Sequence, residues 1–148
     1  MIFGGLNTTA SALTAQRLRM DVISSNMANA DTARAEYVDG KWQPYRRKMV
    51  ETAPGNEGFS SFLNKAMTGG SGLGGVKVTA ISEDKSPFKM VYDPENPDAD
   101  DKGYVAMPNV DPLKEMVDLV GSTRSYEANV TVFNASKGML MKALEIGK

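Results

Sequence analysis

The distribution of proline sets the strongest limit on how this chain can fold. All seven prolines lie between Pro44 and Pro112, so the first 43 and the last 36 residues contain none. Proline removes a backbone donor and clashes with the preceding helical turn, so it breaks helix interiors. Long helices are therefore predicted only at the two ends of the 148-residue chain.

The N-terminal segment has the apolar periodicity of a helix. Its apolar and small polar side chains alternate spacings of three and four, as in a coiled-coil seam. The seam positions are Leu6, Thr9, Leu13, Gln16, Met20, Ile23, Met27 and Ala30. We expect a helix from about Leu6 to Ala28, because Asn26, Asn29 and Asp31 readily leave helical geometry or adopt the left-handed conformation.

The C-terminal segment carries a longer seam of the same kind. Asp111 suits the capping position of a helix and Pro112 its first turn. The seam then follows as Met116, Leu119, Thr123, Tyr126, Val130, Phe133, Lys137, Leu140 and Leu144. A helix that continues to Ile146 would be about 50 Å long at 1.5 Å per residue. Gly121 and Gly138 interrupt it, as tolerated surface glycines or as points where a neighbouring backbone approaches closely.

The middle of the chain is predicted to contain short strands and loops. An Asp-Gly pair between apolar flanks indicates a hairpin over residues 37–42, and residues 44–49 are expected to extend its second strand. The other expected elements are a short helix at 59–67, a Gly-rich linker at 69–75, strands at 76–81 and 88–92 around a polar turn, and an acidic loop at 93–102.

Together these elements predict an α+β fold. The long N- and C-terminal helices would pair as an antiparallel coiled coil, and a small β-rich domain would come between them in sequence. The expected domains are residues 1–32 for the first helix, 33–107 for the β-rich outer domain and 108–148 for the second helix.

Composition argues against an enzyme. Histidine and cysteine are both absent, which removes the commonest general base, thiolate nucleophiles and the usual transition-metal ligands. The net charge of −1 gives no sign of a nucleic-acid partner, and charges or prolines interrupt every apolar stretch short of a transmembrane length. We predict no catalytic residue, no metal site, no cofactor and no small-molecule substrate.

Three local motifs suggest chemistry but have simpler explanations. Residues 70–75 fit a dinucleotide-binding pattern, yet a strand follows where a helix should, so a linker is favoured. Residues 98–103 resemble the start of a calcium loop, but Lys102 and Asn109 occupy ligand positions. The basic cluster at 46–48 lies beside aromatic residues and could bind single-stranded nucleic acid; a solvated strand face or a contact with an acidic neighbour is simpler.

The helical seams are predicted to form an assembly interface. Two such helices could simply pack on each other as a hairpin. However, both carry apolar or small residues outside the narrow seam, and a monomer in water rarely exposes that much apolar surface. The predicted interface residues are Leu6, Leu13, Met20, Ile23, Met27, Met116, Leu119, Tyr126, Val130, Phe133, Leu140 and Leu144.

Both helical ends also carry a family resemblance. Residues 24–32 (SSNMANADT), 103–111 (GYVAMPNVD) and 124–130 (RSYEANV) resemble segments of the flagellar rod and hook proteins, and within them the proximal rod type. The signature positions that match are Asn26, Asn29, Thr32, Asn109, Asp111, Arg124, Tyr126 and Asn129.

The resemblance implies a structural subunit of the proximal rod in the bacterial flagellar basal body. Such a protein polymerises into an axial tube that transmits torque and encloses the export channel. Its partners would be other copies, other rod proteins and the flagellar type III export apparatus, through which it passes without a cleaved signal peptide. The alternative from another class is a helical-hairpin binding module or export chaperone.

Overall fold

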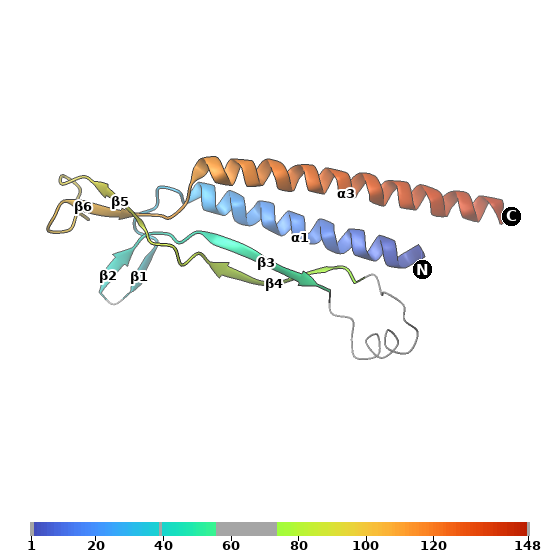
Figure 1. The fold of residues 1–148 in the computed structure, drawn as a ribbon, viewed down its shortest axis with the longest axis horizontal. Helices are drawn as coiled ribbons and strands as arrows, with labels where there is room; N and C mark the ends of the chain where they lie inside the picture. Colours follow the sequence, from blue (N-terminus) through green and yellow to red (C-terminus); the bar gives the residue numbers. More distant parts are fainter. Residues whose placement is uncertain (1, 39, 56–73, 148) are drawn as a thin grey trace. The chain divides into compact units, whose positions relative to one another are not determined.

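The computed structural model describes residues 2–38, 40–55 and 74–147 (Figure 1). Its two long helices are α1 (Ile2–Ala28) and α3 (Pro112–Ile146). Between them in sequence lie six short strands, namely β1 (Glu36–Val38), β2 (Lys41–Gln43), β3 (Lys48–Pro54), β4 (Val76–Glu83), β5 (Lys89–Tyr92) and β6 (Tyr104–Met107). The predicted α+β class is confirmed. The predicted helix at 59–67 and most of the Gly-rich linker at 69–75 lie outside the described residues.

The chain divides into two compact units. The first contains Met1–Met20, Val50–Ala80 and Gly121–Lys148, and the second contains Asp21–Met49 and Ile81–Val120. Each unit therefore holds a part of α1, a part of α3 and a part of the β3–β4 pair. The predicted division into domains at residues 32 and 107 stays a prediction.

Helix α1 begins earlier than expected, at Ile2 rather than near Leu6. Its first turns are rich in Gly, Ser and Thr, which are weak helix formers. Hydroxyls inside the helix bond to carbonyls one turn back, as Thr8 does to Gly4 and Thr9 to Gly5, each at 2.9 Å. At the other end the side chain of Asn29 donates to the Ser25 carbonyl at 2.9 Å and closes the last turn.

Helix α3 begins as the sequence predicts. The Asp111 carboxylate accepts a hydrogen bond from the Leu113 N–H at 3.0 Å, and the Asp111 carbonyl accepts one from the Glu115 N–H at 3.0 Å. Pro112 occupies the first helical position, where its missing N–H costs nothing. The helix continues for 35 residues to Ile146.

In the first unit, α1 contacts both the second helix and the strands. The Thr123 hydroxyl of α3 lies 3.6 Å from the Met20 sulfur. On another side of α1, the Ser11 hydroxyl accepts a hydrogen bond at 3.0 Å from the N–H of Val76, the first residue of β4. Thr9 and Ala15 are buried in this part of α1. A coiled coil along the whole of both helices stays a prediction.

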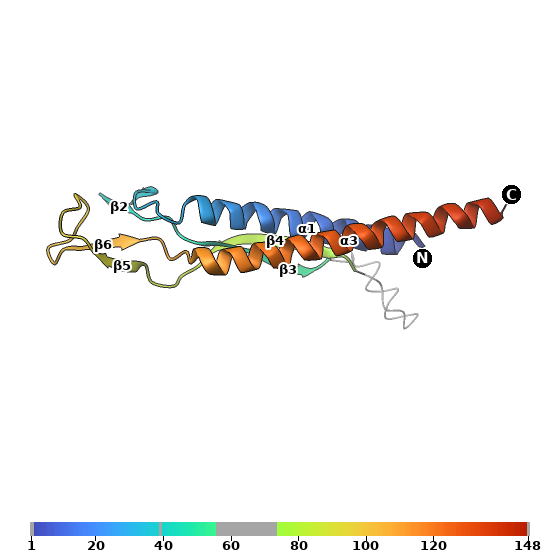
Figure 2. The same cartoon turned by 90° about the horizontal axis from the view of Figure 1, so that it is seen from above.

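Strand pairing differs from the expectation. Residues 76–81 and 88–92 are predicted as two strands around a polar turn, and in the structure they belong to different pairs: β4 pairs with β3, and β5 pairs antiparallel with β6. The hairpin of β5 and β6 is visible in both views (Figures 1 and 2). Its loop is held by the Asp100 carboxylate, which accepts N–H bonds from Lys102 and Tyr104, and by Gly103 at a φ of 79°.

The predicted hairpin at residues 37–42 is confirmed, with Tyr37 opposite Trp42 and their rings edge to face at 5.2 Å. Its predicted extension is wrong, because residues 44–47 form no strand and β3 begins only at Lys48. The Arg47 N–H explains the break. It bonds to the Asn109 side chain at 2.8 Å instead of to a neighbouring strand.

A candidate functional site of buried polar contacts and exposed helix faces

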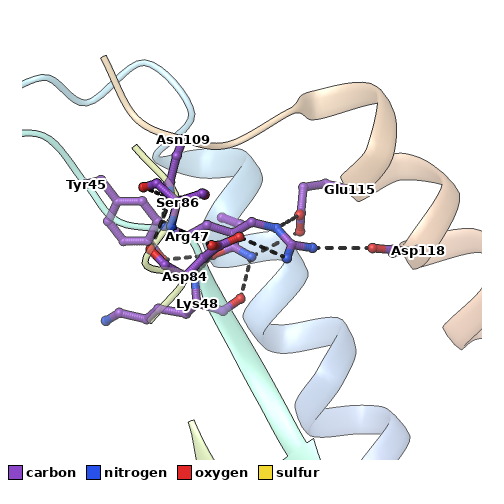
Figure 3. A network of polar contacts seen from close by, with 9 residues as sticks. Tyr45, Arg47, Lys48, Asp84, Ser86, Asn109, Glu115 and Asp118 are labelled. Atoms are coloured by element: carbon purple, nitrogen blue, oxygen red, sulfur yellow. Dashed lines mark hydrogen bonds and ion pairs between the residues drawn. The ribbon is translucent and has the colours of Figure 1, made fainter. Parts of the chain in front are cut away.

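The second unit contains a buried polar network built around Asn26 (Figure 3). The side-chain amide of Asn26 donates to the Lys48 carbonyl at 2.9 Å and to Glu115 Oε2 at 3.0 Å. Its oxygen accepts from the Lys48 N–H at 2.9 Å and from the Tyr45 hydroxyl at 3.1 Å. Asn26 is 1% exposed and uses its two donors and its acceptor. It thus joins the end of α1 to the start of β3 and to α3.

Glu115 is the most buried charged residue in this network, at 0% exposure. Its second oxygen, Oε1, accepts a hydrogen bond from Arg47 Nε at 2.6 Å. An isolated buried carboxylate would be very costly, but this one is paired with a guanidinium and bonded to an amide. Removal of Arg47 would leave this buried carboxylate without its ion-pair partner.

Asn109 connects a further strand end to the same network. Its oxygen accepts from the Arg47 N–H at 2.8 Å. Its amide donates to the Asp84 carbonyl at 3.1 Å and to the Ser86 hydroxyl at 2.9 Å (Figure 3). The Asp84 N–H in turn donates to the Arg47 carbonyl at 2.8 Å. Asn26 bonds to Tyr45 and Lys48, and Asn109 bonds to Arg47. The two asparagines together therefore fix the segment that leads into β3.

Arg47 faces three carboxylates. It lies 2.6 Å from Glu115, 3.4 Å from Asp118 and 3.8 Å from Asp84. The Ser86 N–H and hydroxyl, and more weakly Arg47, lower the pKa of the Asp84 carboxyl from its usual value. The network is thus acidic overall and held by a single guanidinium, of which only 13% of the side chain is exposed.

The network has the features of a structural joint rather than of a catalytic centre. Its buried polar atoms are bonded to one another, as in a network that fixes one arrangement of its elements. Within residues 2–38, 40–55 and 74–147, no group of three or more acidic side chains is placed to hold a metal ion. Among the same residues, no helix is long and apolar enough to cross a lipid bilayer.

The other notable surface is the outer side of α3. Most of its large apolar side chains are exposed, to 74% for Leu113, 71% for Val117 and 86% for Ile146. Glu115 and Ser122, two turns apart on the opposite side of the helix, are buried. The helix therefore has one side that packs within the chain, and its exposed surface carries large apolar side chains together with charged ones such as Arg124 and Glu127.

The predicted interface residues occupy both kinds of surface. Ile23 is buried, whereas Met116 and Leu144 are exposed. The remaining ones are half-buried and comprise Leu6, Leu13, Met20, Met27, Leu119, Tyr126, Val130, Phe133 and Leu140. Whether they contact other molecules stays a prediction.

The signature residues fall into two groups. Asn26 and Asn109 belong to the buried network, Asp111 caps α3, and the Thr32 carbonyl accepts from the Tyr45 N–H at 3.0 Å. Asn29 closes α1. The second group lies on α3, where Arg124 is exposed, Tyr126 is half-buried, and Asn129 donates to the Ser125 carbonyl at 2.8 Å.

Sequence reasoning missed the burial of Arg47 and Glu115. The cluster at 46–48 was interpreted as a solvated strand face or a contact with an acidic neighbour. The first interpretation is wrong for Arg47, whose guanidinium pairs with Glu115 inside the chain. Glu115 lies in the first turn of α3 and is not among the predicted site residues. Charged and apolar residues alternate around Glu115, just after the capping Asp111, and this local pattern does not indicate that the Glu115 carboxylate is buried.

Two segments of the chain match models of known protein families. Residues 6–35 match a family model described as flagella basal body rod protein, and residues 101–146 match one described as flagellar basal body rod FlgEFG protein C-terminal. These segments hold α1 from Leu6 onward, with its signature, and the whole of α3. The class they define is that of the flagellar basal-body rod proteins.

Relatives that match over nearly their whole length show which family of rod proteins the chain resembles. The chain is 67% identical to the flagellar basal-body rod protein FlgC of Bacillus subtilis, over 99% of this chain and 98% of that protein. It is 46% identical to FlgC of Borreliella burgdorferi, over 98% and 97%, and 44% identical to FlgC of Salmonella typhimurium, over 93% and 92%. The chain belongs to the FlgC family of flagellar basal-body rod proteins. Its relatives are named as rod proteins and not as enzymes.

Proposed function

We propose that this chain polymerises through its two terminal helices into the proximal rod, an axial tube that transmits torque and encloses the export channel. Other copies and other rod proteins are its neighbours in the tube. The flagellar type III apparatus exports it without cleavage of a signal peptide. Membership of the FlgC family supports a structural rod subunit, and the proposal adds how the subunit assembles.

The observation that carries the proposal is that most of the large apolar side chains of α3 are exposed. Its exposed side chains include Leu113, Met116, Val117, Val120, Val132, Met139, Met141, Leu144 and Ile146. At roughly 25 cal/mol per Å² of apolar surface removed from water, covering such a helix face would be a large driving force. Monomers rarely leave so many large apolar side chains of one helix open to water, so we infer that neighbouring subunits cover them.

The polar network supports the mechanical part of the proposal. Because Asn26 is bonded to Lys48 and Glu115, and Glu115 to Arg47, we expect the end of α1, the start of β3 and the start of α3 to move together. A subunit that transmits torque needs such a stiff joint at the base of its helices. A hinge at that point would absorb the load.

Substitution of a single seam residue tests the proposal. Val130→Asp places a charge on a half-buried position of α3 and should cost several kcal/mol of packing. We expect it to abolish swimming in a strain whose own FlgC-family protein is replaced by this chain, and to leave isolated basal bodies without a rod. Wild-type swimming with Val130→Asp would contradict the proposal.

Ile81→Asp is the matched control. Ile81 is 50% exposed and lies on β4, outside both helices, so a charge there should leave swimming unchanged. Sedimentation of the purified protein distinguishes a polymerising rod subunit from the alternative function. A binding module or export chaperone would form a defined complex with an exported partner and would not be incorporated into basal bodies.

A further inference from the structure

Helix α1 has a continuous exposed stripe that the other residues described by the structure leave uncovered. The stripe follows spacings of three and four along the helix and is formed by Asn7, Ala10, Thr14, Arg17, Asp21, Ser24 and Ala28. All of these residues are exposed. The Thr14 hydroxyl is satisfied within the helix by the Ala10 carbonyl at 3.0 Å. The stripe is therefore a shallow surface of small side chains with one positive and one negative charge near its middle.

Helix α3 has an exposed stripe of the same spacing. It is formed by Val117, Val120, Arg124, Glu127, Thr131, Ala135 and Gly138, all of them exposed. The Thr131 hydroxyl is likewise satisfied within the helix, by the Glu127 carbonyl at 3.0 Å. This stripe also combines small or apolar side chains with one positive and one negative charge near its middle.

We propose that the α1 stripe of one copy packs antiparallel on the α3 stripe of a second copy. This proposal rests on the assembly function above and names the partner and the register. With Arg17 opposite Glu127, Asp21 comes opposite Arg124, so both contacts join opposite charges. In the same register Thr14 lies opposite Thr131 and Ala10 opposite Ala135, while Ala28 at the other end lies opposite Val117.

The charges and the small residues of both stripes are available for such a contact. Among the residues that the structure describes, Arg17, Asp21, Arg124 and Glu127 form no ion pair within the chain. A Cβ built on Gly138 meets nothing within 4 Å. The glycine is thus open to solvent within its own chain, and small residues on both stripes would let two helices approach closely.

The contact joins two different surfaces, so it is heterologous. One copy uses α1 and the next uses α3, which leaves a free stripe at each end of the pair. Such contacts propagate into rings or open helical arrays rather than closed dimers. A tubular assembly needs contacts that propagate in this way. The proposed partner of each stripe is therefore a second copy of this chain.

Cysteine cross-linking tests the register directly. The 148 residues contain no cysteine, so introduced ones are unique in the chain. We would co-express a Thr14→Cys copy and a longer, tagged Thr131→Cys copy in cells that lack their own FlgC-family protein, and oxidise isolated basal bodies. Close packing brings the two Cα atoms within the roughly 4.4–6.8 Å that a disulfide requires. The expected result is a disulfide heterodimer of the two copies.

The control pair is Thr14→Cys with Lys142→Cys. Lys142 lies 11 residues beyond Thr131 on α3, which is about 16 Å along the helix. We expect the heterodimer from this pair to be at least about tenfold weaker, because disulfide geometry is narrow. Basal bodies that contain the chain but give no Thr14–Thr131 heterodimer would overturn the proposed register and leave the assembly function standing. Basal bodies that never contain the chain would overturn the function itself.

A charge exchange tests the same register without cysteine. Arg17→Glu and Glu127→Arg should each reduce the swimming radius severely, and the double variant should restore it. Lys77→Glu, on exposed β4, should have no effect. If the double variant swims no better than the single ones, the proposed pair is wrong.

Discussion

At the scale of single residues, Asn26 is the side chain on which the most elements depend. Its four hydrogen bonds reach Lys48, Tyr45 and Glu115, and it is 1% exposed. A buried polar group without a partner costs free energy, whereas a satisfied network fixes one arrangement. This explains why a polar residue stands near the end of an otherwise apolar face of α1.

Asn26→Ala should therefore destabilise the chain strongly. The change leaves Glu115 Oε2 and the backbone of Lys48 short of partners, and we expect a loss of about 2–4 kcal/mol in the free energy of unfolding. Urea unfolding followed by circular dichroism measures it. Asn7→Ala on the exposed stripe of the same helix is the control and should change the free energy by less than about 0.5 kcal/mol. Equal effects of the two variants would contradict the role of Asn26.

Asp84 should make the stability depend on pH in the acid range. Its pKa in the folded protein is lowered from the ordinary value of 3.8, mainly by the Ser86 N–H and hydroxyl. A lowered folded pKa contributes stability above the unfolded pKa, and this stability is lost as the pH falls through the unfolded and then the folded value.

Asp84→Asn removes this titration but keeps an oxygen that can accept from Ser86. We expect the free energy of unfolding of the variant to fall less steeply than that of the wild type as the pH is lowered from about 5 to 3. Asp101→Asn, at an exposed loop position, is the control. Parallel curves for Asp84→Asn and the wild type would show that the Asp84 contacts do not contribute.

At the scale of elements, the helices could be predicted from sequence and the strand pairing could not. The start of α3 depends on Asp111 and Pro112, which act on neighbours within one turn. The partner of β4 depends on contacts with residues far away in sequence. The same holds for the polar network, where Asn26 and Glu115 are 89 positions apart and Arg47 and Glu115 are 68 apart. No local pattern reports such pairs.

Gly75 illustrates how a composition-based expectation can hide a specific contact. It was placed in a flexible linker, but a Cβ built on it would collide with the Ser11 hydroxyl of α1. The same hydroxyl accepts the Val76 N–H at 3.0 Å. Gly75 is therefore required where the chain enters β4 close against the helix.

The same substitution should have opposite effects at two glycines. Gly75→Ala should destabilise the chain by about 1–3 kcal/mol, because the helix or the strand must move. Gly121→Ala should stabilise α3 by up to about 1 kcal/mol, because nothing lies within 4 Å of the new Cβ. Denaturant midpoints of the two variants measure both changes. A Gly75→Ala variant as stable as the wild type would show that β4 is not held against α1.

At the scale of the whole molecule, the family was evident in the sequence. Which side of each helix packs within the chain and which is exposed was not. Periodicity identified apolar seams at Leu13 and Val130 without indicating which side of each helix its own chain covers. The structure separates a packed side of α3, which contains Glu115 and Ser122, from an exposed apolar side with Leu113 and Val117. The exposed apolar side chains are the feature of the fold that favours assembly, because neighbouring subunits can cover them.

The central claim is that this chain builds the rod through its terminal helices, and a cryo-EM map of basal bodies from cells that depend on this chain tests it most directly. The account predicts that α1 and α3 of each copy lie in the wall of the axial tube, with the exposed side of α3 covered by neighbouring subunits. A map in which the chain is absent from the rod, or in which Leu113, Val117 and Ile146 stay exposed to solvent, would contradict it.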